Sequence, residues 1–381
     1  MMDHRRTFPW SAAGRGCLRR PLLPAVAALA LLLAAPVHGQ GDQGAGPAKK
    51  ERSGTQACPL KNDLYLNPFN RDSAHHRPIG TGAVYSADDD PFTAIIQQFD
   101  KFGINLGSTS WGLYTALAPS DGPMILVDKL DDRAKSLPVS VRMPPGGVTI
   151  EYPEGESDGN VAIWDEEQNR INHFRRYTWD DGAPKAMQYR DYDPRSLGHG
   201  TYPGDRIGTS ASGVAAPFGI LRGPEANTPG HPIQHALQMV VPRKNNGCPN
   251  VLAKSFILPA VSMDGTAMSN PQHNLGLLPY GTLLAIPPES KGGPDLDELK
   301  LSEAGRRLAQ AVRDYGIYIV DGGGCSPAIR ADQHVEKKLF MKDIPKFYPY
   351  IRVVTNSEWA PDRPATGGGE PLAPNCAFDA P

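Results

Sequence analysis

The stretch VAIWDEEQNRINHFRRYTW, residues 161–179, decides the fold class. It begins with the apolar run Val161–Trp164 and continues, after the polar segment Glu166–Asn169, into a second run that extends from Arg170 to Trp179. Two strand-like runs on either side of a short polar segment are typical of a β-hairpin. The stretch therefore predicts two neighbouring antiparallel strands joined by a turn.

Short strand-like runs also lie on both sides of this hairpin, at residues 124–127, 139–141, 148–150, 235–241, 255–258, 281–286, 317–320 and 350–354. The chain has 381 residues, of which 40 are Gly and 38 are Pro. Together these make up about a fifth of the chain, compared with roughly 12% in average proteins. Helix bundles and coiled coils are excluded, because helix interiors tolerate neither residue.

This pattern predicts an all-β-dominated fold, an antiparallel β-sandwich or jelly roll with two short packed helices. A β-propeller is the main alternative, but the sequence contains no blade-length repeat. The first helix is expected to begin at Pro91, with Asp90 as its cap, and to end before Gly103. The second is expected to run from Ser302 to Gly316, with one apolar face.

Residues 1–40 have the pattern of an export signal. Five arginines precede an apolar run at residues 22–37, and small residues follow it. A retained membrane anchor is the alternative, but Pro24 and Pro36 interrupt the run, which is shorter than the roughly 20 residues that a span needs. Arg5 and its neighbours also resemble the twin-arginine motif, so the export route stays open. We expect a secreted or periplasmic protein with no membrane span once the signal is removed.

The rest of the chain divides by composition. We expect a disordered lead-in at residues 41–57, a single β-rich domain at 58–360 and a Gly/Pro-rich tail at 361–381, tethered by Cys376. Without residues 1–40, 34 basic and 40 acidic residues remain, which gives a net charge near −6. An acidic protein gives no reason to expect a nucleic-acid partner.

Four cysteines remain after the signal, namely Cys58, Cys248, Cys325 and Cys376. An even number in an exported chain predicts two disulfides. One bridge between Cys58 and Cys376 would hold the two ends of the domain together, and Cys248 would then pair with Cys325. All three pairings remain open from the sequence. No two of these cysteines have the spacing of zinc ligands.

A row of rings and hydrogen-bond donors is expected along the second strand of the hairpin, because alternate side chains of a strand share a face. Such a row suits a sugar, whose apolar face stacks on aromatic rings and whose hydroxyls accept hydrogen bonds. The alternative is an exposed strand stabilised by cross-strand pairs. The predicted substrate-binding residues are His173, Arg175, Tyr177, Trp179, Tyr189 and Tyr280.

Three residues are candidates for catalysis: Glu225, His235 and Asp321. His235 opens an apolar strand, where a desolvated imidazole at a cleft wall would serve as acid or base. Asp321 ends an apolar strand beside three glycines, where the backbone can approach a ligand closely. The structural alternatives are a satisfied core histidine and an aspartate that bonds turn amides.

The order of several segments resembles that of an uncharacterised group of secreted bacterial β-rich proteins. The segments are the loop Asn67–Asp72, the turn Thr209–Gly213, Glu225 ahead of His235–Leu237, Pro259–Ala260, Pro279–Gly281 and Tyr315–Asp321 with the glycines that follow. The resemblance spans Asn67 to Asp321. It implies one exported β-rich domain and brings no activity with it.

The functional expectation is an exported enzyme that degrades a polysaccharide. A glycoside hydrolase, slightly preferred, would use Glu225 and Asp321 as its two carboxylates. A polysaccharide lyase would use His235 with Tyr177 or Tyr280, and Arg175 would neutralise a substrate carboxylate. The substrate would be a polysaccharide or an oligosaccharide.

Two other classes remain open. A non-catalytic carbohydrate-binding or envelope-associated module would need the aromatic row but no acid or base. A metal-dependent oxidase of the cupin type would need a histidine cluster, for which the candidates are His75, His76, His231 and His235. We expect no metal and no cofactor, because neither a dinucleotide-binding motif nor a P-loop is present. The sequence does not indicate an oligomeric state.

Overall fold

The computed structural model describes residues 57–99, 103–107, 112–150, 158–180, 183–243, 248 and 250–378. The predicted export signal lies outside the described residues, as does all of the predicted lead-in except residue 57. The described residues form sixteen β-strands and five short α-helices. The prediction of a strand-rich fold with few helices is confirmed. None of the described helices is long and apolar enough to cross a membrane.

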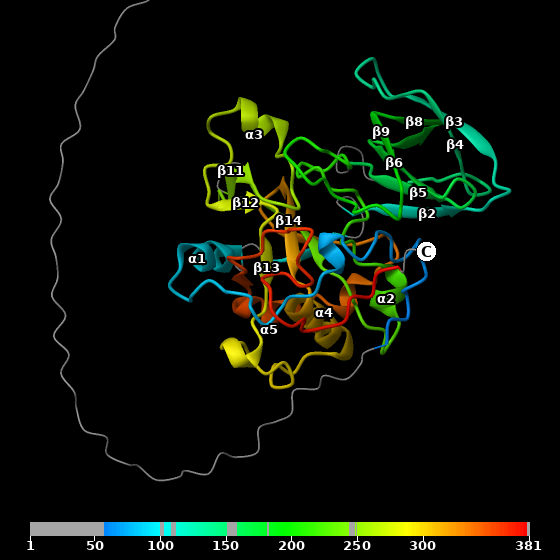
Figure 1. Ribbon diagram of the computed structural model, residues 1–381. Helices are drawn as coiled ribbons and strands as arrows, with labels where there is room; N and C mark the ends of the chain where they lie inside the picture. The colour runs from blue at the N-terminus through cyan, green and yellow to red at the C-terminus, as the bar shows by residue number, and fades with distance from the viewer. Residues whose placement is uncertain are drawn as a thin grey trace, which may run out of the picture. The chain divides into compact units, whose positions relative to one another are not determined.

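The largest sheet has six strands in the order β1-β15-β10-β14-β13-β16 (Figure 1). The strands are β1 (Asn105–Gly107), β15 (Ala328–Arg330), β10 (Leu237–Pro242), β14 (Ile317–Gly323), β13 (Leu283–Ala285) and β16 (Arg352–Val353). The pairs β1–β15 and β10–β14 are parallel, and the other neighbours are antiparallel. The sheet is therefore mixed, with parallel pairs beside the expected antiparallel ones.

A second sheet contains the hairpin at residues 161–179. Its order is β2-β5-β6-β9, with β2 (Tyr114–Ala118), β5 (Val161–Asp165), β6 (Arg170–Arg175) and β9 (Gln188–Tyr192). The antiparallel pair β5–β6 confirms the predicted hairpin, and Asn169 takes the left-handed conformation (φ 51°) in its turn. Asn adopts this conformation more readily than most residues.

Two smaller sheets complete the strands of the described chain. One has the order β4-β3-β8-β7, with β4 (Val139–Arg142), β3 (Met124–Lys129), β8 (Ala183–Ala186) and β7 (Thr178–Asp180), and the other pairs β11 (Leu252–Phe256) with β12 (Leu278–Tyr280). The strand expected at residues 148–150 does not form. Val148 is buried in a hydrophobic cluster, so its apolar character serves packing rather than strand pairing.

The two predicted helices begin where their caps indicated. In α1 (Pro91–Gln97) the Asp90 side chain accepts a hydrogen bond from the Phe92 N–H at 2.8 Å. In α4 (Glu303–Asp314) the Ser302 hydroxyl accepts one from the Gly305 N–H at 3.2 Å. The remaining helices are α2 (Gly223–Asn227), α3 (Gly265–Ser269) and α5 (Ile344–Phe347), with 3-10 turns η1 (Ala74–His76), η3 (Glu289–Lys291), η4 (Lys337–Leu339) and η5 (Tyr348–Tyr350).

Gly316 connects α4 to β14 in the left-handed conformation (φ 84°). A Cβ at this position would approach the Leu284 carbonyl oxygen to 2.8 Å, so only glycine fits. The strand that follows is buried on both faces. Ile317 and Ile319 belong to one hydrophobic cluster, and Tyr318 and Val320 belong to another. A strand buried on both sides requires an uninterrupted apolar run, which explains the sequence IYIV.

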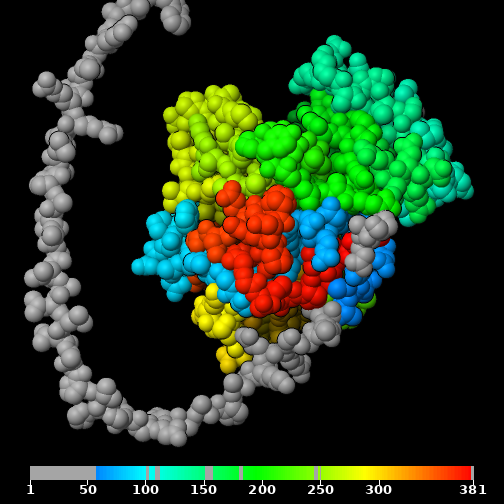
Figure 2. Space-filling view, viewed as in Figure 1, coloured from blue at the N-terminus to red at the C-terminus, as the bar shows by residue number. Residues whose placement is uncertain are grey.

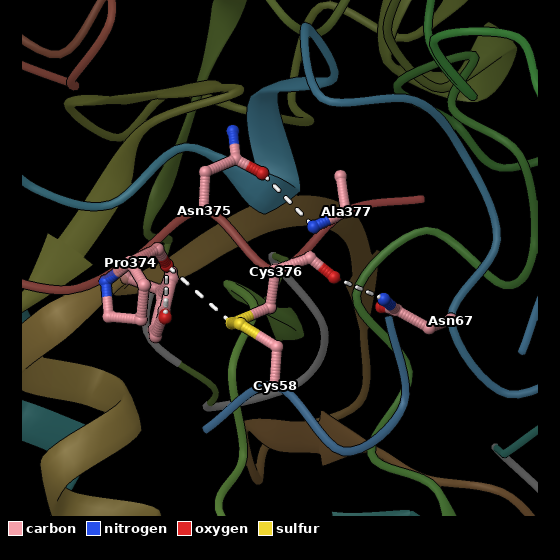
Figure 3. Close-up of a disulfide and its surroundings, with 7 residues drawn as sticks. Cys58, Asn67, Pro374, Asn375, Cys376 and Ala377 are labelled. Carbon is pink, nitrogen blue, oxygen red and sulfur yellow. Dashed lines mark hydrogen bonds between the residues drawn. A yellow bond between two sulfur atoms is a disulfide. The ribbon is translucent and has the colours of Figure 1, made fainter. Parts of the chain in front are cut away.

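Two disulfides are present, so that prediction is confirmed. They join Cys58 to Cys376 and Cys248 to Cys325, with sequence separations of 318 and 77 residues. Figure 3 shows the first bridge, where the Asn67 amide donates to the Cys376 carbonyl at 2.7 Å. Isolated bridges such as Ile79 with Thr366 add backbone contacts, so the C-terminal tail is tied along the start of the domain.

Candidate functional site

A cavity of about 810 Å³ lies in the described part of the chain. It is lined by β6 and β9, by residues 206–216, by residues 263–266 at the start of α3, and by the ends of β14 and β15. In Figure 2 a notch separates the yellow-green surface around α3 from the teal surface around β3 and β4. The volume lies in the range of ordinary ligand pockets.

The lining of this cavity is strongly cationic. It contains three carboxylates, those of Asp158, Asp264 and Asp321, but seven basic side chains: Arg133, Lys135, Arg175, Arg190, Arg206, Arg243 and Arg330. Seven cations against three carboxylates leave an excess of four positive charges, whereas the whole chain has a formal net charge of −2. The lining of the cavity thus has a net positive charge, although the chain as a whole has a net negative charge.

Two of the carboxylates form ion pairs within the cavity. Asp158 accepts from Arg175 at 3.2 Å. Asp264 is paired with Arg243, which also donates to the Thr266 hydroxyl at 3.0 Å. Asp264 caps α3 and accepts hydrogen bonds from the Thr266 N–H and hydroxyl. Burial opposes ionisation, but these hydrogen bonds and the charge of Arg243 lower the pKa of Asp264 below its ordinary value.

Asp321 lies near the end of β14, as the strand pattern predicted, and lines the cavity. Its carboxylate accepts from the Gly322 N–H at 2.8 Å and is 3.5 Å from the Ala211 nitrogen. Burial raises the pKa of Asp321 and outweighs the opposing charge of Arg330. The cavity therefore holds one carboxyl whose pKa is raised, that of Asp321, and another whose pKa is lowered, that of Asp264.

The turn Thr209–Gly213 forms one wall of the cavity. Gly213 has positive φ (84°), and the Ser212 backbone bonds both the Val320 carbonyl and the Val261 N–H. These bonds hold the turn against the strand that carries Asp321. The turn also supplies the Ser210 carbonyl, which accepts from the Arg206 guanidinium at 2.6 Å.

His173 lies in the cavity wall with its imidazole almost fully buried. Its Nδ1 is 3.5 Å from the Thr209 hydroxyl, and its Nε2 has no hydrogen-bond partner among the described residues. Burial, reinforced by Arg330, Arg175 and Arg190, lowers the pKa of His173 to about 3. The imidazole is therefore neutral at physiological pH, with a buried polar atom at the cavity wall.

The side chains that were expected to form one row along the hairpin do not all lie on the same side of the sheet. His173 and Arg175 line the cavity, but Arg176 is left-handed (φ 50°) and interrupts the alternation of faces. As a result Tyr177 packs beside Phe174, with ring centroids 5.7 Å apart, in the interior of the sheet.

Two of the other expected substrate-binding residues also lie outside the cavity lining. Trp179 belongs to β7 in a different sheet. Tyr280 is fully buried, and its hydroxyl accepts from the Asn274 amide at 3.1 Å. Tyr189 does line the cavity, and its hydroxyl donates to Asn172 at 2.9 Å.

Glu225 and His235 form a buried pair that does not line the cavity. The His235 Nε2 is 3.0 Å from a Glu225 carboxylate oxygen, and its Nδ1 is 3.0 Å from the Ala236 carbonyl. Burial alone would lower the pKa of His235, but the charge and hydrogen bond of Glu225 outweigh it and raise the pKa. The Arg222 N–H also donates to Glu225 at 2.7 Å. The structure thus brings Asp321 and Arg175 to one cavity and places Glu225 and His235 in the interior.

The other histidines considered as metal ligands do not form a metal site in the described chain. His75 and His76 lie in η1 and are buried, with ring centroids 3.8 Å apart. Within the ranges that the structure describes, no group of three His, Cys, Asp or Glu side chains is placed to hold a metal ion. The His231 carbonyl accepts from Arg307 at 2.8 Å, a structural contact.

Sequence reasoning missed most of the charged residues of the cavity. Arg206, Arg243 and Arg330 come from separate elements, and no local motif marks them. Asp264 does carry a signal, because Asp before Gly-Thr is typical of a helix cap, but the capping pattern says nothing about a cavity. Comparison with known proteins finds no matching family model, no matching curated protein and no matching solved structure.

Proposed function

We propose that this protein is an exported enzyme that hydrolyses glycosidic bonds in the cavity lined by Asp321. One observation carries the proposal: two carboxyl groups of the same cavity, Asp321 and Asp264, have pKa values displaced in opposite directions. Glycosidases need such a pair, one carboxyl protonated to act as an acid and one ionised to act as base or nucleophile.

In this proposal Asp321 donates its proton to the oxygen of the scissile glycosidic bond as that bond breaks. The ionised Asp264 accepts a proton from a water molecule as the water oxygen attacks the anomeric carbon, and this oxygen becomes the hydroxyl of the new reducing end. Asp158 also lines the cavity, so a substitution of Asp158 is the comparison for a substitution of Asp264. Glu225, which the sequence suggested as the second carboxylate, is replaced by Asp264 because it is engaged with His235 outside the cavity lining.

A second reaction, lyase cleavage, is favoured by another set of residues in the same cavity. His173 and Tyr189 line it together with Arg175. A lyase needs a base, a proton donor and a cation that neutralises a substrate carboxylate, and these three residues are of those types. The two reactions differ in their products, since only the lyase forms an unsaturated sugar.

The experiment is to incubate the purified full-length protein with a panel of polysaccharides and to measure both new reducing ends and ultraviolet absorbance. Hydrolysis produces the first signal alone, and a lyase produces both. We expect Asp321→Asn to lower turnover by about 100-fold or more, the range lost with a general acid. The matched control is Asp191→Asn, on the exposed part of β9, which should retain activity.

Two results would contradict the proposal. Turnover that survives Asp321→Asn would exclude this residue as the acid. Binding of a polysaccharide with no cleavage product of either kind would instead indicate a non-catalytic carbohydrate-binding module.

A further inference from the structure

Seven basic side chains reach the cavity from six separate stretches of the chain. Arg133 and Lys135 follow β3, Arg175 ends β6 and Arg190 lies within β9. Residues 206, 243 and 330 contribute the remaining arginines, from a loop and from the ends of β10 and β15. A charge run in the sequence would be an ordinary solvated surface, but convergence from separate elements concentrates positive potential in one hollow.

Carboxylates neutralise only part of these cations. Asp158 pairs with Arg175 and Asp264 with Arg243, and Asp131, which is not part of the lining, pairs with Arg133. Arg206 is half-buried, yet its guanidinium bonds neutral groups, the Ser262 hydroxyl at 2.6 Å and the Ser210 carbonyl. In the described part of the chain, the side chains of Lys135 and Arg190 have no hydrogen bond or ion pair. The side chains of Lys135 and Arg190 are therefore available to a ligand.

The arginines of the cavity affect the pKa of a neighbouring side chain, His173. His173 and Arg190 are direct cross-strand partners in the β6–β9 pair, so their side chains share a face of the sheet. After burial, the charges of three arginines are what disfavour a proton on His173. The charge of Arg206 is likewise disfavoured, first by burial and then by Arg190. An anion in the cavity would relieve both effects.

We infer that the substrate of this cavity is an anionic glycan, with carboxylate or sulfate groups on successive sugars. The inference rests on the proposed function for the glycan and on the seven basic side chains for its charge. Guanidinium groups pair with carboxylate and sulfate oxygens through parallel hydrogen bonds, and several of them along a cavity match an anion repeated from one sugar to the next. A neutral glycan would leave the excess charge without a counterpart.

The test measures binding separately from turnover, by titration calorimetry on full-length protein carrying Asp321→Asn. The probes are a uronic-acid hexasaccharide, a sulfated hexasaccharide and a neutral hexasaccharide of similar length. We expect at least one acidic probe to bind about tenfold or more tightly than the neutral one, and its affinity to fall as salt is raised from about 0.05 to 0.5 M. The two acidic probes decide between carboxylate and sulfate.

Two exposed cations, Arg190 and Lys135, allow a test that does not threaten folding. Arg190→Gln and Lys135→Gln should each weaken binding of the acidic probe by roughly fivefold. The control is Arg306→Gln, which removes an arginine from the exposed side of α4, where it pairs with Asp297. This variant should bind like the parent.

Each outcome bears on the inference. Equal affinity for neutral and acidic probes, no binding of any probe, or an equal loss in the Arg306→Gln control would overturn it. An acidic probe that binds but is never cleaved by the unmutated protein supports the anionic ligand and refutes the proposed hydrolysis. Cleavage of neutral glycans alone would support the hydrolysis and overturn the anionic substrate.

Discussion

Cys248 and Cys325 form a disulfide beyond the ends of β10 and β14, two parallel strands that lie side by side in the six-stranded sheet. Arg243 directly follows β10, and Asp321 lies two residues before the end of β14. Both line the cavity. The bridge therefore fastens together the two strand ends that present a cation and the proposed acid.

Replacing this bridge should affect activity. In Cys248→Ser/Cys325→Ser the two strand ends lose their covalent link, so Asp321 and Arg243 are held less accurately. We expect kcat/KM to fall about ten- to hundredfold, as small displacements of catalytic groups do. Steady-state kinetics on the glycan identified above would measure this, and unchanged kinetics would show that the sheet alone fixes the geometry.

The other bridge should affect stability instead. Cys58→Ser/Cys376→Ser opens a loop of 318 residues, and neither cysteine lines the cavity. We expect the free energy of unfolding to fall by about 2–5 kcal/mol, because the unfolded chain regains conformational freedom. Urea denaturation measures the loss. Activity at low temperature should match the parent, and a matched loss of kcat would contradict this division between the two bridges.

Asp321→Asn should remove activity without removing stability. The pKa of Asp321 is raised on folding, so its contribution to stability is present at low pH and is lost as pH rises through the raised pKa. Above the raised pKa, the buried negative charge destabilises the folded state, and Asn carries no such charge. We expect the urea midpoint at pH 8 to equal or exceed that of the parent. A large drop would mean that the carboxylate is structural.

The pair Glu225–His235 should behave as a structural unit. The pKa of His235 is raised, so the stability it contributes is complete below its unfolded pKa and is lost as pH rises through the folded one. His235→Ala leaves a buried carboxylate unpaired and should cost about 3–5 kcal/mol. Glu225→Gln/His235→Ala should cost less than His235→Ala alone. Additive losses in this double-mutant cycle would show that the two side chains are not coupled.

Asp314, at the end of α4, offers a stabilising change. Burial raises its pKa to about 6, although Gln310 donates to it at 2.8 Å. Its folded pKa exceeds the unfolded value, so the folded state loses stability as pH rises through about 6. Asp314→Asn keeps an acceptor for Gln310 and removes the charge. We expect a gain of about 1–2 kcal/mol at pH 8 that disappears at pH 4. A gain that is the same at both pH values would contradict the ionisation argument.

The parts of the fold that are encoded locally could be predicted from the sequence. The Asp90 and Ser302 caps fix the starts of two helices, and four polar residues after Asp165 fix the hairpin turn. The pairing of β10 with β14 could not be predicted, because parallel partners are joined by a long connection and share no turn signal.

The site was predictable only in part for a similar reason. Asp321 stands out because a carboxylate follows an apolar run, and the position of Arg175 follows from strand alternation. The same rule fails for Tyr177, since a single left-handed residue, Arg176, changes the direction of the chain. His235 has the sequence context of a catalytic base, but burial beside Glu225 depends on packing that no local pattern records.

The bridge between Cys58 and Cys376 has a mechanical consequence. Tension applied to the chain before the first cysteine and after the second passes through two sulfur atoms, so the 318 residues of sequence separation between them bear none of it. A protein tethered at one end and pulled at the other would therefore bear the force outside the stretch between the two cysteines. The sheets and the cavity would keep their shape until the sulfur–sulfur bond is reduced.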